Sequence, residues 1–577
     1  MSRASSYEAV PLLLDQEPLE QQSQFSTFLN KSCHRSRWKM GASSSIDRTS
    51  PEQQELETLA ASTGCLPFLK SGFAKISDPH SKAIPHEYLL QSLSLPSLTV
   101  NLPSPPIAND FPRLLPHVGS AAAHLLFSAG KDGTDWIAFL RGFNRCCARM
   151  PAASSLNLLY RLFSDVCERA GVDCPLIFDP DDADCGKVSG RFGASDLLML
   201  FWLCWVFRQS PRLSKRGGGR PLVLPDLSHL VLSGFVACGE VGDDEGIRDL
   251  GGLSCGKSVA VQKLSGWVLT TVPGVADCFS QFFKDKIRAI AVLGDNLNNC
   301  VASPSDSSYP NVKEVFLLTF GRAWALSLTQ RNTLREELCA ASFPGLYSDT
   351  LNNLLYRSST HGKGLSRFWS RVEGYRGPLL FLFSGNSSDS SAGISIERRW
   401  VVGVLTEQGF EDRDTFYGSS AHLYAVCPIF RAFSPVGKER NFLYSHQRPT
   451  GRVYEASPKS VGLAFGGAIG NERIFIDEDF SKVIIRHHAV DKTYQHGSLI
   501  PNQGYLPVEA SLVEAEAWGF GGESSKKLQN AFKKREELFT EQRRKVDLKT
   551  FGGWEDSPEK MMMDMISDPN RVRREDR

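Results

Sequence analysis

The sequence has little of what marks an exported, membrane-spanning or zinc-binding protein. Its longest apolar run, Leu197 to Phe207, has 11 residues, and a membrane-spanning helix needs about 20. The 14 cysteines include no C-x-x-C pair, which excludes the common zinc motifs and predicts a reducing compartment, the cytosol or nucleus. A secretory pattern is also missing, because Asp15 directly follows the short PLLL run.

Net charge is nearly absent as well. The 65 basic and 64 acidic residues leave +1, so no global field would draw the chain to nucleic acid. The hydrophobic content of 41% is typical of a globular protein. A chain of 577 residues is too long for one core, so we expect two or three domains.

Residues 1–50 are rich in Ser and Gln, which predicts a disordered leader. Within them, the segment from Met40 to Ser45 (MGASSS) fits an N-myristoylation signal if translation starts at Met40, since Gly41 then becomes the N-terminal residue. The alternative is a chance glycine in a serine-rich tail. A single myristoyl chain would give only reversible membrane binding.

Residues 51–212 show apolar side chains at helical spacing, which predicts a stack of short helices. The breaks at 77–88 and 128–140 have the position of EF-hand loops, but their ligands are wrong for calcium. Pro79, Lys82 and Tyr88 occupy ligand, glycine and terminal-glutamate positions in the first loop, and the second ends on Ala138. We expect EF-hand-like helices without calcium; a calcium-responsive protein is the alternative.

The string GGLSCGKS, Gly251 to Ser258, satisfies the phosphate-binding pattern G-x-x-x-x-G-K-[ST]. Phosphate would lie on Gly256, Lys257 and Ser258. That chemistry needs a buried strand before the loop and a helix directly after it, whereas the preceding GEVGDDEGIRDL is strongly acidic. We expect a glycine-rich surface loop, with a P-loop NTPase as the alternative. Residues 213–329 otherwise predict a helical bridge with linkers, including one at 301–310.

From about residue 330 the sequence changes to short β-rich runs, among them LLFLFS (379–384), WVVGVLT (400–406) and RIFIDEDF (473–480). Several runs are apolar throughout, which indicates strands covered on both faces. A helix near 334–341 is expected to supply part of that cover.

The order of motifs LLYRSSTHGKGLSRFW, WVVGV, FYGSSAHLY, GLAFGGAIGNERIFIDEDF and EAEAWGF resembles that of TLDc domains over residues 330–522. The helical region in front is similar to the branch of this family with EF-hand-like N-terminal helices. That branch includes the myristoylated lysosomal TLDc proteins associated with mTOR. The texture is closest to that of plant members.

The resemblance implies a two-sheet β core flanked by helices, binding to the vacuolar-type proton ATPase and a link to oxidation resistance. No catalytic residue is implied. The motif residues are expected to be structural: Gly403, Tyr417, Gly418, Gly466, Gly467, Asn471, Glu472, Asp477, Trp518 and Gly519.

Two other features of this domain are interpreted structurally. Gly462, Gly466, Gly467 and Gly470 are expected in a turn between strands. His487 and His488 could suggest a metal or acid–base site together with nearby acidic residues such as Glu516. Adjacent residues of a strand point to opposite faces, however, so we expect hydrogen-bonded histidines and surface carboxylates.

Residues 523–577 are predicted to form a charged helix and tail. The apolar positions of the helix, Leu528, Phe532, Leu538 and Phe539, make a narrow stripe that favours docking to a partner over contribution to a core. Basic residues exceed acidic ones there, which favours an acidic partner surface or anionic lipid.

The sequence therefore predicts an α+β protein: a leader (1–50), an EF-hand-like all-helical domain (51–212), a helical bridge (213–329), a TLDc-like domain (330–522) and a charged C-terminal helix with its tail (523–577). The predicted function is that of a non-enzymatic adaptor that needs no cofactor or metal. The expected partner is the V-type proton ATPase or a related endomembrane complex. The expected location is cytoplasmic, peripheral on lysosomal or vacuolar membranes.

Overall fold

The computed structural model of the chain describes residues 50–103, 107–127, 133–179, 187–214, 221–242, 256–292, 316–331, 333–388, 397–448, 459–553, 560, 562, 563 and 566. Residues Glu52–Arg577 form one compact unit, and Met1–Pro51 are a separate unit. Of the leader predicted for residues 1–50, only Ser50 is among the described residues, and Gly41 lies outside them.

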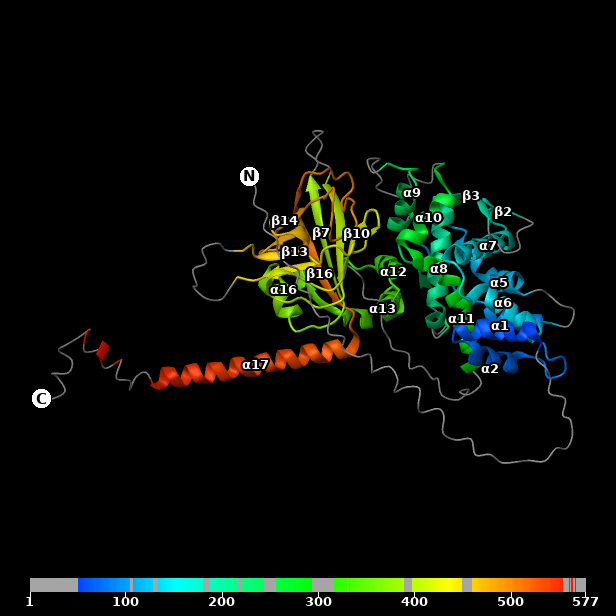
Figure 1. The fold of residues 1–577 in the computed structure, drawn as a ribbon, viewed down its shortest axis with the longest axis horizontal. Coiled ribbons are helices and arrows are strands. Elements are labelled where there is room, and N and C mark those ends of the chain that lie inside the picture. Colours follow the sequence, from blue (N-terminus) through cyan, green and yellow to red (C-terminus); the bar gives the residue numbers. More distant parts are fainter. Residues whose placement is uncertain are drawn as a thin grey trace, which may run out of the picture. The chain divides into compact units, whose positions relative to one another are not determined.

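The N-terminal half is built mainly of helices (Figure 1). Helix α8 is buried on all sides, and the run from Leu197 to Phe207 within it is at most 4% exposed. A helix that is apolar all round must be covered by its neighbours, so the predicted buried helix is confirmed. The helices are α1 (Pro51–Ser62), α2 (Leu66–Ile76), α3 (His86–Leu93), α4 (Phe111–Leu114), α5 (Val118–Leu126), α6 (Trp136–Cys147), α7 (Ala152–Ala170), α8 (Ala194–Leu213), α9 (Ser228–Ala237), α10 (Val261–Thr271) and α11 (Cys278–Val292).

The prediction that residues 51–212 are all helical is wrong, because the strands β1 (Val100–Asn101), β2 (Leu176–Phe178) and β3 (Val188–Gly193) lie between the helices. The predicted helical bridge, residues 213–329, also contains two short strands, β4 (Leu222–Val223) and β5 (Ser258–Ala260). β1 pairs with β4 in parallel, and β3 pairs antiparallel with both β2 and β5. These strands are only two to six residues long, too short for an alternating pattern to stand out from the helical one.

The C-terminal half contains one continuous sheet of 11 strands, in the order β11-β10-β8-β7-β16-β15-β14-β13-β12-β9, with β6 also paired to β16. The strands are β6 (Leu354–Arg357), β7 (Leu379–Ser388), β8 (Glu397–Thr406), β9 (Arg413–Tyr417), β10 (Ala421–Cys427), β11 (Arg431–Phe433), β12 (Leu443–His446), β13 (Gly462–Ala468), β14 (Asn471–Asp477), β15 (Lys482–Ile485) and β16 (Val508–Gly519).

The two-sheet expectation is thereby corrected, and β16 provides the reason. Its first residues, Val508–Ser511, pair with β15, and Ser511–Gly519 pair with β7 on the other side. A strand of 12 residues is long enough to serve both halves, so they are hydrogen-bonded into a single curled sheet.

Apolar side chains on both faces of the sheet are buried, as the sequence predicts. In β7, Leu380 and Leu382 join the core shared with the helices, whereas Phe381 and Phe383 join a second core enclosed by the sheet. Since successive side chains of a strand point to opposite faces, the strand is apolar throughout because both faces are covered.

Six more helices accompany the sheet: α12 (Phe320–Thr329), α13 (Thr333–Ala341), α14 (Tyr347–Leu351), α15 (Ser358–His361), α16 (Leu365–Val372) and α17 (Gly522–Gly553). α13 confirms the helix predicted near 334–341, and α17 the helix predicted after the β-rich domain. In Figure 1, α17 is one uninterrupted helix. No helix in the described part of the chain is both long and apolar enough to cross a membrane.

Candidate functional site

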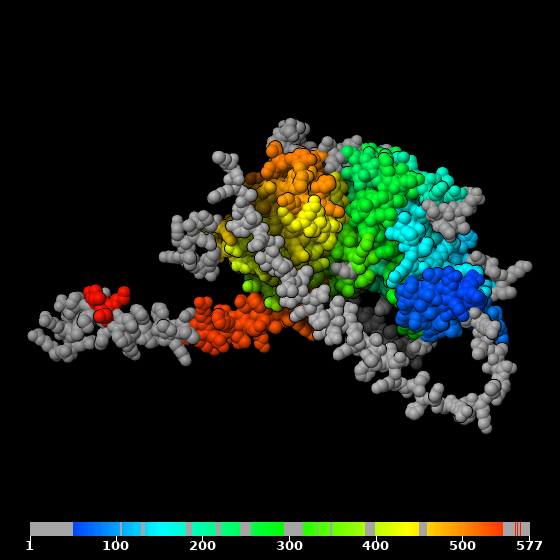
Figure 2. All heavy atoms as spheres, viewed as in Figure 1, coloured from blue at the N-terminus to red at the C-terminus, as the bar shows by residue number. Residues whose placement is uncertain are grey.

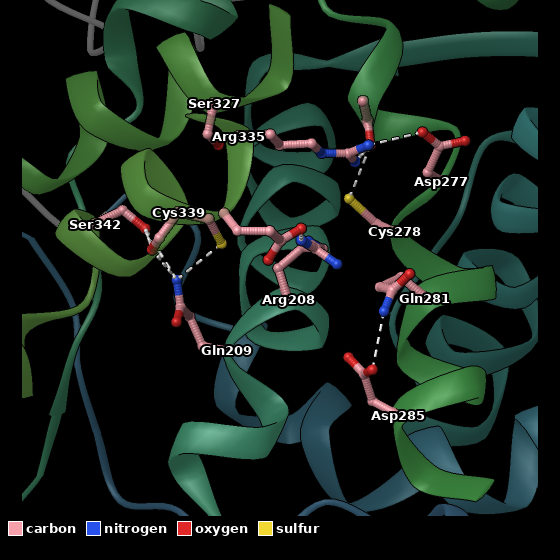
Figure 3. Close-up of polar contacts among 12 residues, drawn as sticks. Arg208, Gln209, Asp277, Cys278, Gln281, Asp285, Ser327, Arg335, Cys339 and Ser342 are labelled. Atoms are coloured by element: carbon pink, nitrogen blue, oxygen red, sulfur yellow. Dashed lines mark hydrogen bonds and ion pairs between the residues drawn. The ribbon is translucent and has the colours of Figure 1, made fainter. Parts of the chain in front are cut away.

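A buried polar cluster joins α8 to α13 and the residue after it (Figure 3). The fully buried Gln209 of α8 donates through Nε2 to the carbonyl oxygen of Cys339 and the hydroxyl of Ser342, both at 2.9 Å. Next to it, the buried Arg208 pairs with Glu336 of α13. Buried polar groups of this kind are costly unless they are bonded. The cluster thus ties the helical half to the C-terminal half.

A second pair in Figure 3 links α13 to Asp277, the residue before α11. Arg335 Nη1 lies 2.9 Å from Asp277 Oδ2, and its Nη2 donates to the carbonyl oxygen of Gly274 at 3.0 Å. This pair also connects secondary-structure elements rather than facing a cavity.

A buried carboxylate connects the start of the C-terminal half to the sheet. Glu516 of β16 is 0% exposed and accepts hydrogen bonds from the backbone N–H groups of Leu317 and Leu318, at 2.8 and 3.2 Å. The indole N–H of Trp518 also donates to it at 3.0 Å. Burial raises the pKa of Glu516, and these hydrogen bonds and Arg357 act against the rise. The expected surface carboxylate is therefore an internal clamp, because this end of β16 is covered on both faces.

A buried ion pair fixes the loop after β15. Arg473 and Asp491 are both 1% exposed, with Nη1 and Oδ2 2.8 Å apart. Arg473 also donates to the carbonyl oxygens of Gln495 and Gly497, at 2.7 and 2.8 Å, and Asp491 accepts from the N–H of Thr493 at 2.8 Å. Burial lowers the pKa of Arg473, and Asp491 opposes that effect.

The polar motif residues named from the sequence lie in strands: Tyr417 is the last residue of β9, and Asn471, Glu472 and Asp477 belong to β14. The hydroxyl of Tyr417 lies 2.7 Å from Ser445 Oγ and accepts from the N–H of Glu411 at 2.8 Å. Asp477 Oδ1 accepts from the N–H of Ser481 at 2.8 Å. These contacts connect the ends of β9 and β14 to the segments beside them, and a structural role for the motif residues stays a prediction.

The sequence predicts that the four glycines lie in a turn between strands, and the structure shows that three of them do not. Gly462, Gly466 and Gly467 belong to β13, and only Gly470 lies in the turn before β14. Gly467 has a φ of +82°, and a Cβ there would lie 2.3 Å from the carbonyl oxygen of Asn471. Glycine is needed in the strand because only it allows this backbone and this close approach.

The two adjacent histidines do not lie in a strand, contrary to the sequence interpretation. β15 ends at Ile485, and the N–H of Arg486 makes one more bond to β14, to the carbonyl oxygen of Arg473 at 2.8 Å. His487 and His488 follow outside the strand. The ring of His487 stacks on Tyr505 at 4.8 Å. Burial lowers the pKa of His488. Among the described residues, no three His, Cys, Asp or Glu side chains come together as a metal site.

Exposed apolar side chains lie in the loops that carry and flank these histidines. Tyr505 is 69% exposed and Leu506 82%, and Val490, earlier in the segment between β15 and β16, is 79% exposed. Ile469, in the turn between β13 and β14, is 51% exposed, and Gly467 near the end of β13 lies close to His488. We call Ile469, His487, Val490, Tyr505 and Leu506 the loop surface. Exposed apolar side chains on loops are candidates for interaction sites.

The first turns of α17 pack on the sheet domain. Ser525 Oγ donates to the carbonyl oxygen of Arg376 at 2.6 Å, and Gln529 Nε2 to that of Arg371 at 2.8 Å. The ring of Phe532 lies against Gly374, where an added Cβ would come within 2.4 Å of it. Phe532 is thus occupied within the chain, unlike the other three apolar positions predicted to dock.

A cavity of about 610 Å³ opens beside Phe532. Burial, and then Glu536 and Asp412, raise the pKa of Glu373. The lining is rich in carboxylates and includes Glu373, Glu407, Glu411, Asp412, Arg376 and Phe532. Carboxylates alone do not define a ligand.

From Lys534 to Lys545, α17 is exposed. Leu538 and Phe539 are 50% and 67% exposed, and Leu528 nearer the domain is 54% exposed. In the view of Figure 2 no other described segment covers this part of the helix. Between Gly522 and Lys545, the basic residues of α17 are Lys526, Lys527, Lys533, Lys534, Arg535, Arg543, Arg544 and Lys545.

The described part of the phosphate-binding string does not open a helix. Ser258 belongs to β5, pairs with Gly193, and accepts a hydrogen bond from Arg191 Nε at 2.8 Å. Helix α10 begins only at Val261. A phosphate loop needs its lysine and serine at a helix start, so Lys257 and Ser258 are in the wrong context. Residues 251–255 lie outside the described residues.

The two loops with EF-hand-like positions are paired. Ile84 and Thr134 form an isolated antiparallel bridge, with N···O distances of 2.8 and 2.9 Å. α2 and α3 flank the first loop, and α5 and α6 the second. Tyr88 and Ala138 lie in the helices that follow the loops.

The sequence did not predict the buried ion pair between Arg473 and Asp491 or the loop surface. Nothing local distinguishes Arg473 from an exposed strand arginine, because its partner Asp491 is supplied by a later loop. Leu506 in the polar stretch NQGYLPVE is not a sufficient signal, because single exposed apolar residues are normal on protein surfaces.

Comparison with protein families matches residues 331–521 to the TLDc domain. A search of curated proteins finds no match for the chain. The matched range begins just before α13 and ends at Gly521, the residue before α17. It therefore includes the whole sheet and the loop surface.

Proposed function

Residues 331–521 are a TLDc domain, and from this premise we propose that the chain is a non-enzymatic TLDc regulator linked to oxidative-stress resistance or growth signalling. The proposed partner is the V-type proton ATPase or a related complex of lysosomal or vacuolar membranes. The observation that carries the proposal is the exposed part of α17, where Leu538 and Phe539 stand among basic side chains. An amphipathic helix of this kind suits an apolar groove with an acidic rim.

The loop surface is proposed as a second contact on the same partner. It lies on the sheet domain and offers apolar side chains held by a rigid scaffold, as interface loops commonly do. The partner is taken from the TLDc resemblance. The sites on this chain are taken from the exposure of its own residues.

The experiment is affinity capture from detergent-solubilised endomembranes with the full chain as bait. Substituting Leu538→Glu and Phe539→Glu should lower recovery of proton-pump subunits about tenfold, because a buried anchor residue contributes roughly 1–2 kcal/mol or more. The matched control is Thr540→Glu with Gln542→Glu, which adds the same charge at exposed positions of the same turns. Truncating α17 would be less clean, since its first turns pack on the domain.

Failure of the unsubstituted chain to recover any pump subunit would exclude the proposed partner. Equal losses in the Leu538/Phe539 variant and in its control would instead attribute the effect to charge and remove α17 as an apolar ligand.

We also propose that the helices flanking the Ile84–Thr134 bridge are an EF-hand-like pair that works without calcium. The bridge between the two loops supports the pairing, and Lys82 and Tyr88 at ligand-loop positions argue against the ion. A binding heat on adding calcium to the full chain would contradict this. A myristoyl group on Gly41, if translation starts at Met40, would supply a reversible membrane contact.

A further inference from the structure

Two cysteines at the end of α7 are brought together by the way this helix stops. Gly171 has a φ of +65°, its N–H donates to the carbonyl oxygen of Glu168 at 3.1 Å, and the N–H of Val172 donates to that of Cys167 at 2.9 Å. This pair of bonds is a Schellman turn, which reverses the chain at a helix end. Cys174 consequently packs against the core that contains Cys167 and interacts with the Cys167 thiol.

The two thiols have different surroundings. Cys167 is 1% exposed, whereas Cys174 is half-buried between the exposed Asp173 and Pro175. The Cys167 thiol, and to a smaller extent the N–H of Leu176 and the hydroxyl of Ser164, lower the pKa of Cys174 against the effect of burial. For Cys167, the interaction with Cys174 and burial both raise the pKa. Cys174 is therefore the more nucleophilic and more accessible thiol, and Cys167 is the buried thiol next to it.

We propose that Cys174 and Cys167 are a peroxide-modified pair, in which Cys174 is oxidised first and Cys167 resolves it as an intramolecular disulfide. The site lies in the helical half, outside the TLDc domain, and does not depend on the function proposed for that domain. The ligand class is a small hydroperoxide that can reach a half-buried sulfur.

The chemistry balances without a metal or cofactor. The Cys174 thiolate attacks one oxygen of hydrogen peroxide: an S–O bond forms, the O–O bond breaks, and the leaving hydroxide takes up a proton to become water. The Cys167 sulfur then attacks the sulfur of the Cys174 sulfenic acid. The S–S bond forms and the S–O bond breaks, and the leaving hydroxide takes the proton of the Cys167 thiol. Two thiols and one peroxide give one disulfide and two waters, and a thiol reductant reverses the result.

The chain contains a matched comparison pair. The thiols of Cys204 in α8 and Cys278 in α11 also interact with each other. Both are 0% exposed. If proximity of two thiols were sufficient, both pairs would oxidise; if access is also required, only Cys167–Cys174 will.

The test uses the full-length reduced chain, hydrogen peroxide, and peptide mapping by mass spectrometry without reduction. We expect loss of two hydrogen atoms from the linked peptides that contain Cys167 and Cys174, while the Cys204 and Cys278 peptides stay unlinked. Cys167→Ser should leave Cys174 as a sulfenic acid that a dimedone probe labels, and Cys174→Ser should abolish the link. Cys204→Ser should leave it unchanged.

The unsubstituted chain alone can overturn the proposal, so no variant has to fold for the test to count. An unmodified Cys174, a disulfide from Cys174 to another cysteine, or equal oxidation of the Cys204–Cys278 pair would each reject it.

Discussion

At the scale of single residues, we expect the buried charges to affect the free energy of unfolding more than the exposed ones. Arg473 and Asp491 are nearly inaccessible, and each is the oppositely charged partner of the other. Leaving one partner of a buried pair alone is far more costly than breaking a pair in solvent. The difference in stability can be measured by comparing this buried pair with an exposed ion pair between two strands of the same domain.

Asp491→Asn is expected to destabilise the protein by about 3–5 kcal/mol, because it leaves the Arg473 guanidinium buried without an anion. The control is Glu509→Gln, which breaks the pair between Lys482 and Glu509, where both side chains are more than half exposed, and should cost less than about 1 kcal/mol. Thermal unfolding of the two variants gives the comparison. Similar midpoints for both would show that the Arg473–Asp491 pair is not a structural anchor.

At the scale of elements, α17 divides into a packed base and an exposed remainder. Phe532→Ala should loosen the base by about 1–3 kcal/mol, because it removes a ring packed on Gly374. Hydrogen exchange in the first three turns of α17 is the measurement, and it should become faster. Phe539→Ala, at a 67% exposed position, serves as the control and should leave exchange there unchanged. Faster exchange in both variants, or in neither, would contradict the division.

Element types were largely predictable from the sequence, and pairings were not. The apolar run at 197–207 and the apolar strands near 379–406 carry their environment in their own composition. The single curled sheet could not be read in the same way, because it depends on β16 pairing with β7 and β15 across long stretches of chain. Likewise, the candidate docking stripe at Leu538 and Phe539 was visible in the sequence, whereas the contact of Phe532 with Gly374 was not.

At the scale of the whole molecule, the helical half and the sheet share one core and meet around α9. The N–H of Phe430, in the loop after β10, donates to the carbonyl oxygen of His229 at 3.2 Å, and the two rings meet edge to face at 6.1 Å. Ser233, one turn further along α9, donates to the carbonyl oxygen of Phe430. A titratable ring therefore lies at the junction of the two halves.

Because of this ring, we expect the stability of the folded protein to fall at acidic pH. Burial, with Arg322 adding to it and Asp226 opposing, lowers the pKa of His229 to about 3 from the usual 6.5. The unfolded chain takes up the proton near pH 6.5 and the folded chain does not. The stabilisation is therefore complete above that pH and is lost as the pH falls from 6.5 toward 3.

Between about pH 7 and pH 5, the native protein should lose about 2 kcal/mol more stability than a His229→Leu variant, whose side chain cannot titrate. Unfolding by urea at the two pH values gives this difference, and His80→Leu, at an exposed position, should retain the native pH dependence. If His229→Leu retains it too, protonation of His229 is not what weakens the protein in acid, and the junction owes its stability to the apolar core that the two halves share.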